Sequence, residues 1–257
     1  MIKFFRKIRQ NLLSDGKTGK YLKYAIGEII LVVIGILIAL YLNNLNEQNT
    51  IHKQQENYLI LVKHEMISNI KSLEKEKKEL SEALNGTKKI LNISNSDSKI
   101  SQLSESELSK IFVSAIGSDI FVQYENGALN QIIFSGGLKD IENDSIRGIL
   151  ASWQGKIDHV RLQEDQVNII IEKIKSLISK FGDTRSIIDD LGYSKSLELD
   201  LSTNKGSNKN LLKLKEFENV IFELILSGNA LQQSAYSGLE SEMQSLVELI
   251  NQELNKK

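Results

Sequence analysis

The sequence predicts an all-α protein in which one N-terminal transmembrane helix continues into an elongated antiparallel helical bundle. Three observations lead to this fold class. A nearly uncharged segment, Tyr24–Leu42, lies close to the N-terminus. Beyond it, apolar residues recur at spacings of three and four almost throughout, which is the helical period. The 257 residues include no proline, so long helices need not be interrupted.

The segment 24–42 has the length and composition of a transmembrane helix. Its only charge is Glu28, and a hydrocarbon core about 30 Å thick needs roughly 20 mostly apolar helical residues. Residues 1–23 hold seven Lys or Arg and one Asp, a net charge of +6, whereas residues 43–257 hold 31 acidic and 25 basic residues, a net charge of −6.

This charge asymmetry predicts the orientation, because basic flanks remain on the cytoplasmic side. We expect residues 1–23 in the cytoplasm, a single pass through the inner membrane, and residues 43–257 in the periplasm. Ala39-Leu40-Tyr41 offers no A-x-A-like cleavage site. An uncleaved signal anchor is therefore favoured over a cleaved signal peptide.

Residues 2–13 form a basic amphipathic segment. At 100° per residue its aromatic and aliphatic side chains share one face and its cations the other, as in a helix that lies flat on a membrane. The residues predicted to contact inner-leaflet lipids are Phe4, Phe5, Arg6, Lys7, Ile8 and Arg9. The alternative is a basic region that happens to have helical spacing.

Three residues of the span are candidates for contact with a partner's transmembrane helix. Glu28 is a membrane carboxylate, which is costly and therefore a functional candidate. Gly35 and Ala39 form a small-xxx-small pair that permits close helix approach. At its shallow depth Glu28 can also simply be solvated at the interface, and both interpretations stay open.

Apolar spacing predicts the elements of the bundle. We expect long helices at about 57–93, 144–181 and 211–254, shorter helices at about 105–116 and 122–134, and loops at 92–106 and 183–210. The pattern from 146 to 181 is the most regular; Asn143 or Asp144 is its expected N-cap and Gly182 its end. The second loop contains a short alternation of Leu197, Leu199 and Leu201.

Glu164 lies on the apolar stripe of the 144–181 helix, where a carboxylate is unusual. It either pairs with a cation of a neighbouring helix and sets the bundle register, or lines a ligand pocket; we favour register. Trp153 on the same stripe is more typical of a core residue than of a cofactor contact.

The N-terminal residues resemble a known family. KFFRKIRQNLL and KYLKYAIGEIILVVIGILIALYLNN are similar to the start of an uncharacterised family of single-span, signal-anchored inner-membrane proteins of Bacteroidota. The match is close over residues 1–45 and looser beyond, although FSGGLK at 134–139 is similar to the family's Ser-Gly before a long helix. The family's interfacial tryptophan is absent here. The resemblance implies an inner-membrane anchor with a helical periplasmic domain, and implies no activity.

Motifs that carry chemistry are weak. There is no cysteine, and no H-E-x-x-H or G-x-S-x-G motif. His52 and Glu56 have the spacing of a metal-ligand pair, but surface residues are the commoner explanation. Gly16-Lys17-Thr18-Gly19-Lys20 lacks the first glycine and the preceding strand of a phosphate loop. Asp144-Ser145-Ile146 matches a short O-glycosylation pattern of exported proteins in the same phylum, which is a hypothesis only.

These observations predict a membrane-anchored scaffold or interaction protein, such as an accessory subunit of an inner-membrane complex, rather than an enzyme. We expect no cofactor, no metal and no nucleic acid. The expected partners are membrane lipids and another membrane protein or a second copy of the chain. The alternative is a periplasmic ligand-sensing domain, which would need a signalling partner because few residues lie on the cytoplasmic side.

Overall fold

The computed structural model describes residues 18–256, which form helices and connecting segments with no strand. The chain divides into two units, Met1–Asn57 and Tyr58–Lys257. The first unit contains the beginning of α2 (Thr18–Ser94). The predicted span 24–42 lies within this helix, whose apolar residues there are exposed. By length and composition, α2 is the one helix among the described residues that is suited to cross a membrane.

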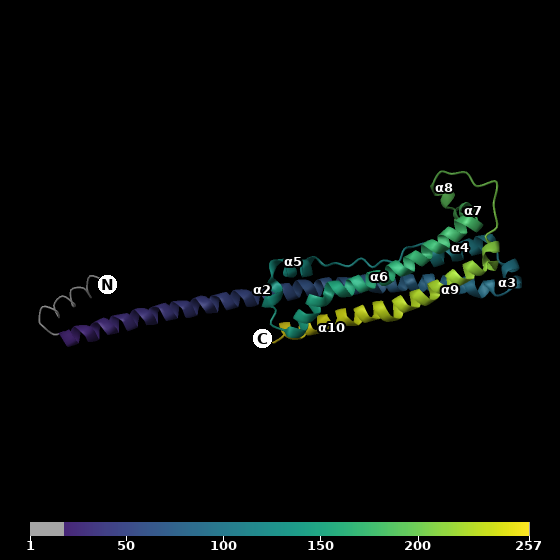
Figure 1. Cartoon of the computed structure of the whole chain (residues 1–257). Helices are drawn as coiled ribbons and strands as arrows, with labels where there is room; N and C mark the ends of the chain where they lie inside the picture. Colours follow the sequence, from purple (N-terminus) through teal and green to yellow (C-terminus); the bar gives the residue numbers. More distant parts are fainter. Residues whose placement is uncertain (1–17, 257) are drawn as a thin grey trace. The chain divides into compact units, whose positions relative to one another are not determined.

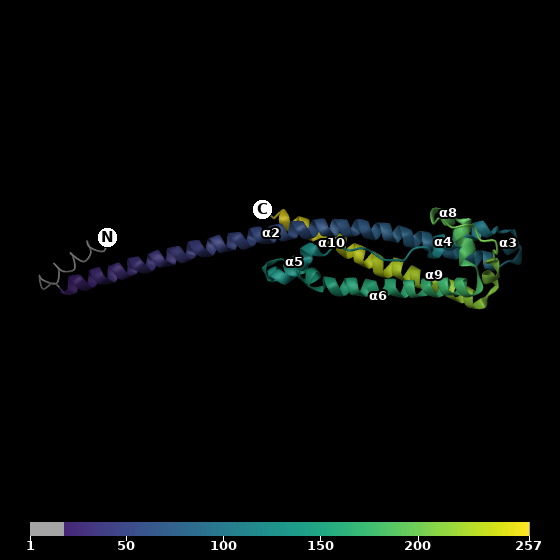
Figure 2. The same ribbon diagram turned by 90° about the horizontal axis from the view of Figure 1, so that it is seen from above.

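The second unit is built on three long helical segments that lie side by side (Figures 1 and 2). They are α2 beyond Tyr58, α6 (Asp144–Phe181), and α9 (Lys215–Ala230) followed by α10 (Ser237–Leu254). Their apolar stripes meet in one core, which includes Trp153, the largest fully buried side chain. The all-α prediction is therefore confirmed.

The order of contacts gives the direction of each segment. Along α6, Lys156 pairs with Glu242 and the later Lys173 with the earlier Glu223, so α6 and α9–α10 are antiparallel. On α2, Lys77 pairs with Glu240, whereas Leu84, further along, packs against Gly228. The helix pair α9–α10 is thus antiparallel to both α2 and α6, and those two run in the same direction.

After α2, the chain runs back to the start of α6 through α4 (Glu105–Ile116), an extended segment and α5 (Gly127–Ser135). A helix over 122–134 was predicted, and its first part is wrong: residues 118–126, here called the strap, are extended and run from α4 to α5 (Figure 1). Ile120 and Val122 are buried while Phe121 and Gln123 are exposed, which is an alternation of period two. Glycines at 117 and 127 bound the segment.

The two predicted loops contain helices that their composition obscured. α3 (Asp97–Gln102) lies within 92–106 and buries Ile100. Within 183–210 lie α7 (Thr184–Asp190), α8 (Tyr193–Ser196) and the start of the 3₁₀ turn η2 (Lys209–Lys213). These helices are too short to show several apolar repeats, and α3, α7 and η2 each bury only one or two apolar side chains.

Helix ends follow the local signals closely. α6 has the predicted bounds, and its N-cap is Asn143, whose side chain accepts hydrogen bonds from the N–H groups of Ser145 and Ile146. After α5, Gly136 adopts φ = 73° as the C-cap and leads into the 3₁₀ turn η1 (Gly137–Asp140).

The predicted helix 211–254 is interrupted. Between α9 and α10 lies η3 (Leu231–Tyr236), a π-helical turn. A π turn accommodates extra chain within a helix and changes which side chains face the core. Here it lies beside a buried polar group, as described below.

Candidate functional site

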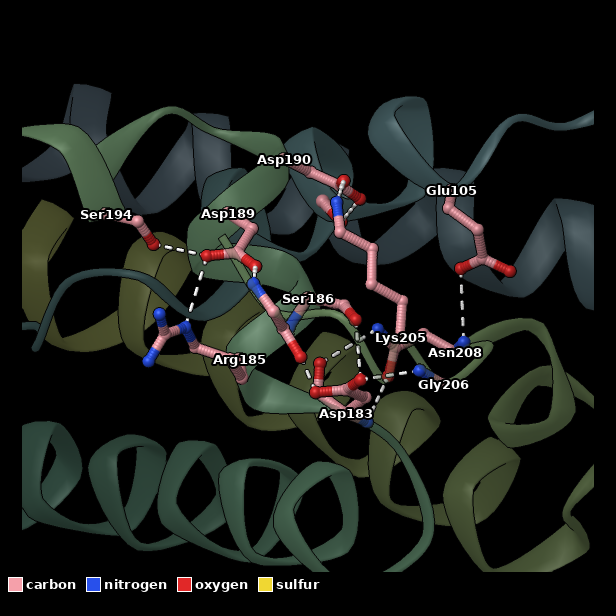
Figure 3. Close-up of polar contacts among 12 residues, drawn as sticks. Glu105, Asp183, Arg185, Ser186, Asp189, Asp190, Ser194, Lys205, Gly206 and Asn208 are labelled. Atoms are coloured by element: carbon pink, nitrogen blue, oxygen red, sulfur yellow. Dashed lines mark hydrogen bonds and ion pairs between the residues drawn. The ribbon is translucent and has the colours of Figure 1, made fainter. Parts of the chain in front are cut away.

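The segment after α6 is irregular but firmly anchored by polar side chains. The Asp189 carboxylate is fully buried and accepts hydrogen bonds from the Ser194 hydroxyl, the Arg185 guanidinium (3.1 Å) and the Ser202 N–H (2.8 Å) (Figure 3). These donors favour the ionised form. The hydrogen bond from Ser194, followed by that from Ser202, lowers the pKa of Asp189 to about 2. One carboxylate thus joins α7, α8 and the chain beyond them.

A second anchor closes the base of the same segment. The buried side chain of Asn208 accepts a hydrogen bond from the Asp183 N–H (2.7 Å) and donates one to the Asp183 carbonyl (3.1 Å) (Figure 3). The Asp183 carboxylate in turn accepts from the Gly206 N–H (2.6 Å) and the Ser186 hydroxyl (2.5 Å). Residues about 25 positions apart are therefore held together, and the segment closes into a fixed loop.

This loop presents large apolar side chains to solvent. The exposed fractions of Tyr193, Leu197, Leu199 and Leu201 lie between 47% and 61%. Large apolar side chains held at the surface of a fixed loop are candidates for contact with a partner. The four residues, here called the leucine loop, come from α8 and the extended chain after it. Binding through a preorganised loop loses little conformational entropy.

Acidic side chains separate the leucines. Glu198 and Asp200 alternate with them in the sequence, and both residues are exposed. Neither side chain is in an ion pair with another described residue. Glu198 has φ = 56°, a left-handed conformation that is unusual for a residue other than glycine. The surface suits a partner that combines apolar and basic groups.

A buried polar centre lies at the middle of the bundle, around Glu164. This side chain is completely buried, and the Arg161 guanidinium one turn earlier donates to Oε2 (2.6 Å). The other oxygen, Oε1, accepts from the Tyr236 hydroxyl (2.8 Å) and from the Val122 N–H (3.1 Å). Glu164 therefore contacts α6, η3 and the strap at once. Its cation comes from its own helix, whereas we expected one from a neighbouring helix.

The strap is held on its α6 side by side chains rather than by a strand. Asn168 uses both ends of its amide, because Oδ1 accepts from the Ile120 N–H and Nδ2 donates to the Ile120 carbonyl, each at 2.9 Å. Arg161 donates to the Val122 carbonyl (2.5 Å). These bonds pair backbone groups that would otherwise lie against the bundle without partners.

Side chains of α2 hold the strap from its other side. Asn69 pairs with both backbone groups of Glu125 at 2.7 Å, and Glu76 accepts from the Phe121 N–H (3.1 Å). Glu65 accepts from the first N–H groups of α5. Burial raises the pKa of Glu65 and of Glu76, partly offset by the hydrogen bonds that these carboxylates accept.

Two tyrosines complete the polar centre. Burial, together with the nearby Glu164 charge, raises the pKa of both Tyr124 and Tyr236, so both hydroxyls stay protonated. Tyr236 donates to Glu164, but the buried Tyr124 hydroxyl has no partner among the described residues. The Arg161 guanidinium lies 3.7 Å from the centroid of the Phe121 ring, a cation–π contact over the exposed side of the strap.

The other predicted site residues belong to other parts of the sequence. Glu28, Gly35 and Ala39 are in the first unit, and a Cβ atom on Gly35 would meet nothing within 4 Å. The candidates for lipid contact, Phe4, Phe5, Arg6, Lys7, Ile8 and Arg9, lie outside the described residues. They belong to the N-terminal segment.

Three further predictions concern single residues or pairs. Trp153 lies in the core, as favoured. His52 and Glu56 are 3.7 Å apart on α2. Ser145, in the predicted modification pattern, is exposed on the first turn of α6.

The anchors of the leucine loop were missed by sequence reasoning. A partial signal was available, because Asp183 three residues before Ser186 is the spacing of an N-cap, and Asp183 does cap α7. No local spacing indicates that Asp189 would meet Ser202.

No group of three or more His, Cys, Asp or Glu residues suited to hold a metal ion occurs within residues 18–256. Comparisons with family models, with curated proteins and with solved structures found no match.

Proposed function

We propose that this protein is a membrane-anchored interaction protein, whose helical bundle presents the leucine loop to a protein partner. The proposal includes a single-pass inner-membrane anchor with a cytoplasmic N-terminus and a periplasmic bundle. The apolar helix at the N-terminus supports the anchor. The change from +6 before the span to −6 after it supports the orientation.

The observation that carries the proposal is the combination of exposure and anchoring in the leucine loop. Exposed leucines on a mobile loop would be unremarkable. Here buried Asp189 and Asn208 fix the backbone, so the apolar side chains are held in solvent at a cost that no contact within the described chain offsets. A partner with apolar and basic side chains would offset this cost. If the protein is an accessory subunit, another subunit of its complex is such a partner.

Site-specific photocrosslinking in the native host tests the proposal. A photoreactive amino acid replaces Leu199 in the full-length protein, and a matched variant carries it at Leu162, an α6 leucine with 63% exposure. We expect a discrete protein adduct from position 199 and none from 162. Equal labelling at both positions, or adducts at neither, would contradict an interaction through this loop.

The orientation has its own test, because the chain has no cysteine. Single cysteines introduced at Ser14 and at Ser118 provide unique thiols before and after the span. A membrane-impermeant maleimide added to cells with a permeabilised outer membrane should label Ser118→Cys and spare Ser14→Cys until the inner membrane is disrupted. The opposite pattern would reverse the topology.

A ligand-sensing role is the second candidate, and one feature favours it. An apolar pocket between α4, α6 and α7 is lined by Phe112, Ile116, Ile178 and Ile187, and also by Lys175. Lys175 already pairs with Glu172 and Asp119, so the pocket suits a small apolar molecule. Thermal shift of the full-length protein with short-chain alcohols tests this, since binding to the folded state raises the melting temperature. No shift at millimolar ligand would exclude this class of ligand.

A further inference from the structure

We propose that the strap, residues 118–126, is a releasable latch that is coupled through Glu164 to the π turn η3, so that displacing one loosens the other. This inference does not depend on the leucine loop being an interaction surface. It concerns three elements of the bundle that meet at a single carboxylate.

The first step is the way in which the strap is attached. Within the part of the chain that the structure describes, residues 118–125 make no hydrogen bond to another backbone group. Their partners are side chains of α2 and α6, including the two bidentate amides of Asn69 and Asn168. In a β-sheet, removing one strand breaks the backbone hydrogen bonds of its neighbour. Here the strap is bound by side chains, so the backbone hydrogen bonds of α2 and α6 stay intact when the strap leaves. Release therefore does not require either helix to unfold.

The second step is the sharing of Glu164 Oε1. One oxygen accepts from the Val122 N–H of the strap and from the Tyr236 hydroxyl of η3. Both donors contact the same oxygen of this buried carboxylate, so a shift of the carboxylate after loss of either donor changes the geometry of the other bond. After release, Glu164 keeps Arg161 as its ion-pair partner on the same helix, and this retained pair makes the open state accessible.

The third step is the nature of η3. A π turn is a rare helical geometry that is often found at functional positions. The turn brings Tyr236 into the core, where its side chain is completely buried against Glu164. Without that hydrogen bond, the π turn has less to favour it over the regular α-helix on both sides. The π turn and the strap are thus coupled, because both are held by the same carboxylate.

The exposed face of the strap is the place where a partner would act on the latch. Phe121 is half-exposed and stacks against Arg161, which also donates to the Val122 carbonyl. A partner that engages Phe121 would compete directly for Arg161. Because Arg161 stays paired with Glu164, the perturbation reaches η3 through loss of the Val122 N–H bond to the oxygen that Tyr236 also contacts.

Hydrogen–deuterium exchange of the full-length protein in detergent micelles tests the coupling. Tyr236→Phe removes one hydroxyl far from the strap in sequence and should accelerate exchange of the amides of 120–125 about tenfold. Tyr58→Phe, which removes a hydroxyl near Ser135, is the matched control and should leave the strap unchanged. In the reverse direction, Asn168→Ala should accelerate exchange in 231–236.

The pattern of exchange distinguishes a latch from local loosening. If the strap opens as one unit, the Ile120 and Glu125 amides, bound by Asn168 and Asn69, accelerate as much as the Val122 amide. Acceleration confined to Val122 in Tyr236→Phe, or no effect of Asn168→Ala on 231–236, would overturn the proposal. Circular dichroism of each variant verifies that the helical content is retained, and Glu164→Gln, which keeps an acceptor oxygen, provides a milder second perturbation with the same expected direction.

Discussion

Replacing Glu164 by leucine should strongly destabilise the bundle. The leucine removes the acceptor for three donors, the Arg161 guanidinium, the Tyr236 hydroxyl and the Val122 N–H. Arg161 is three-quarters buried and Tyr236 fully buried, so water cannot replace Glu164 at low cost. Removing one partner of a buried ion pair typically costs about 3–5 kcal/mol, because the other charge remains buried.

The size of the effect can be measured as a melting temperature. A unit of about 200 residues loses roughly 2–4 °C per kcal/mol, so Glu164→Leu should lower the melting temperature by roughly 6–20 °C. The assay is thermal unfolding of the full-length protein in micelles, followed by circular dichroism. Glu164→Gln keeps one acceptor oxygen and should lose less, about 1–3 kcal/mol.

The control is the same substitution on the same helix at an exposed position. Glu172 pairs with Lys175 at 2.8 Å in a largely solvated setting, so Glu172→Leu should change stability by less than about 1 kcal/mol. If Glu164→Leu is as mild as Glu172→Leu, the polar centre does not hold the strap and η3 together, and the reasoning is refuted.

Three other predictions follow from single contacts. A methyl group on Gly228 would lie 2.6 Å from Leu84, so Gly228→Ala should cost about 1–3 kcal/mol in urea unfolding, whereas Gly238→Ala, with nothing within 4 Å, should stabilise by up to about 1 kcal/mol; equal effects would contradict the close packing. Because the pKa of Asp189 is lowered to about 2, its contribution to stability is present above its ordinary value near 3.8 and is lost as the pH falls towards 2; exchange in the leucine loop should rise over that range, and Asp189→Asn should remove this pH dependence. Glu28→Leu should reduce recovery of a co-purifying membrane partner, and unchanged recovery would contradict the partner contact.

Local sequence determined the position of the long helical segments and several of their ends. Helix α6 has the predicted bounds because its signals are local: an apolar residue every three or four positions, Asn143 before the first turn and Gly182 after the last. The apolar composition of 24–42 likewise identifies a helix suited to a membrane without reference to any other part of the chain. Each of these features depends on residues within a few positions of one another.

Tertiary structure decided the features that are candidates for function. The strap has a sequence compatible with a helix, but it is extended because Asn168 and Asn69, 48 and 56 residues away, bind its backbone. The π turn at Tyr236 contacts a carboxylate 72 residues away. The leucine loop is fixed by Asp189 and Asn208, whose partners include backbone groups up to 25 residues away. Spacing along a sequence reveals which side chains share a helix face, but only the packed bundle determines which distant backbone group a buried carboxylate or amide will meet.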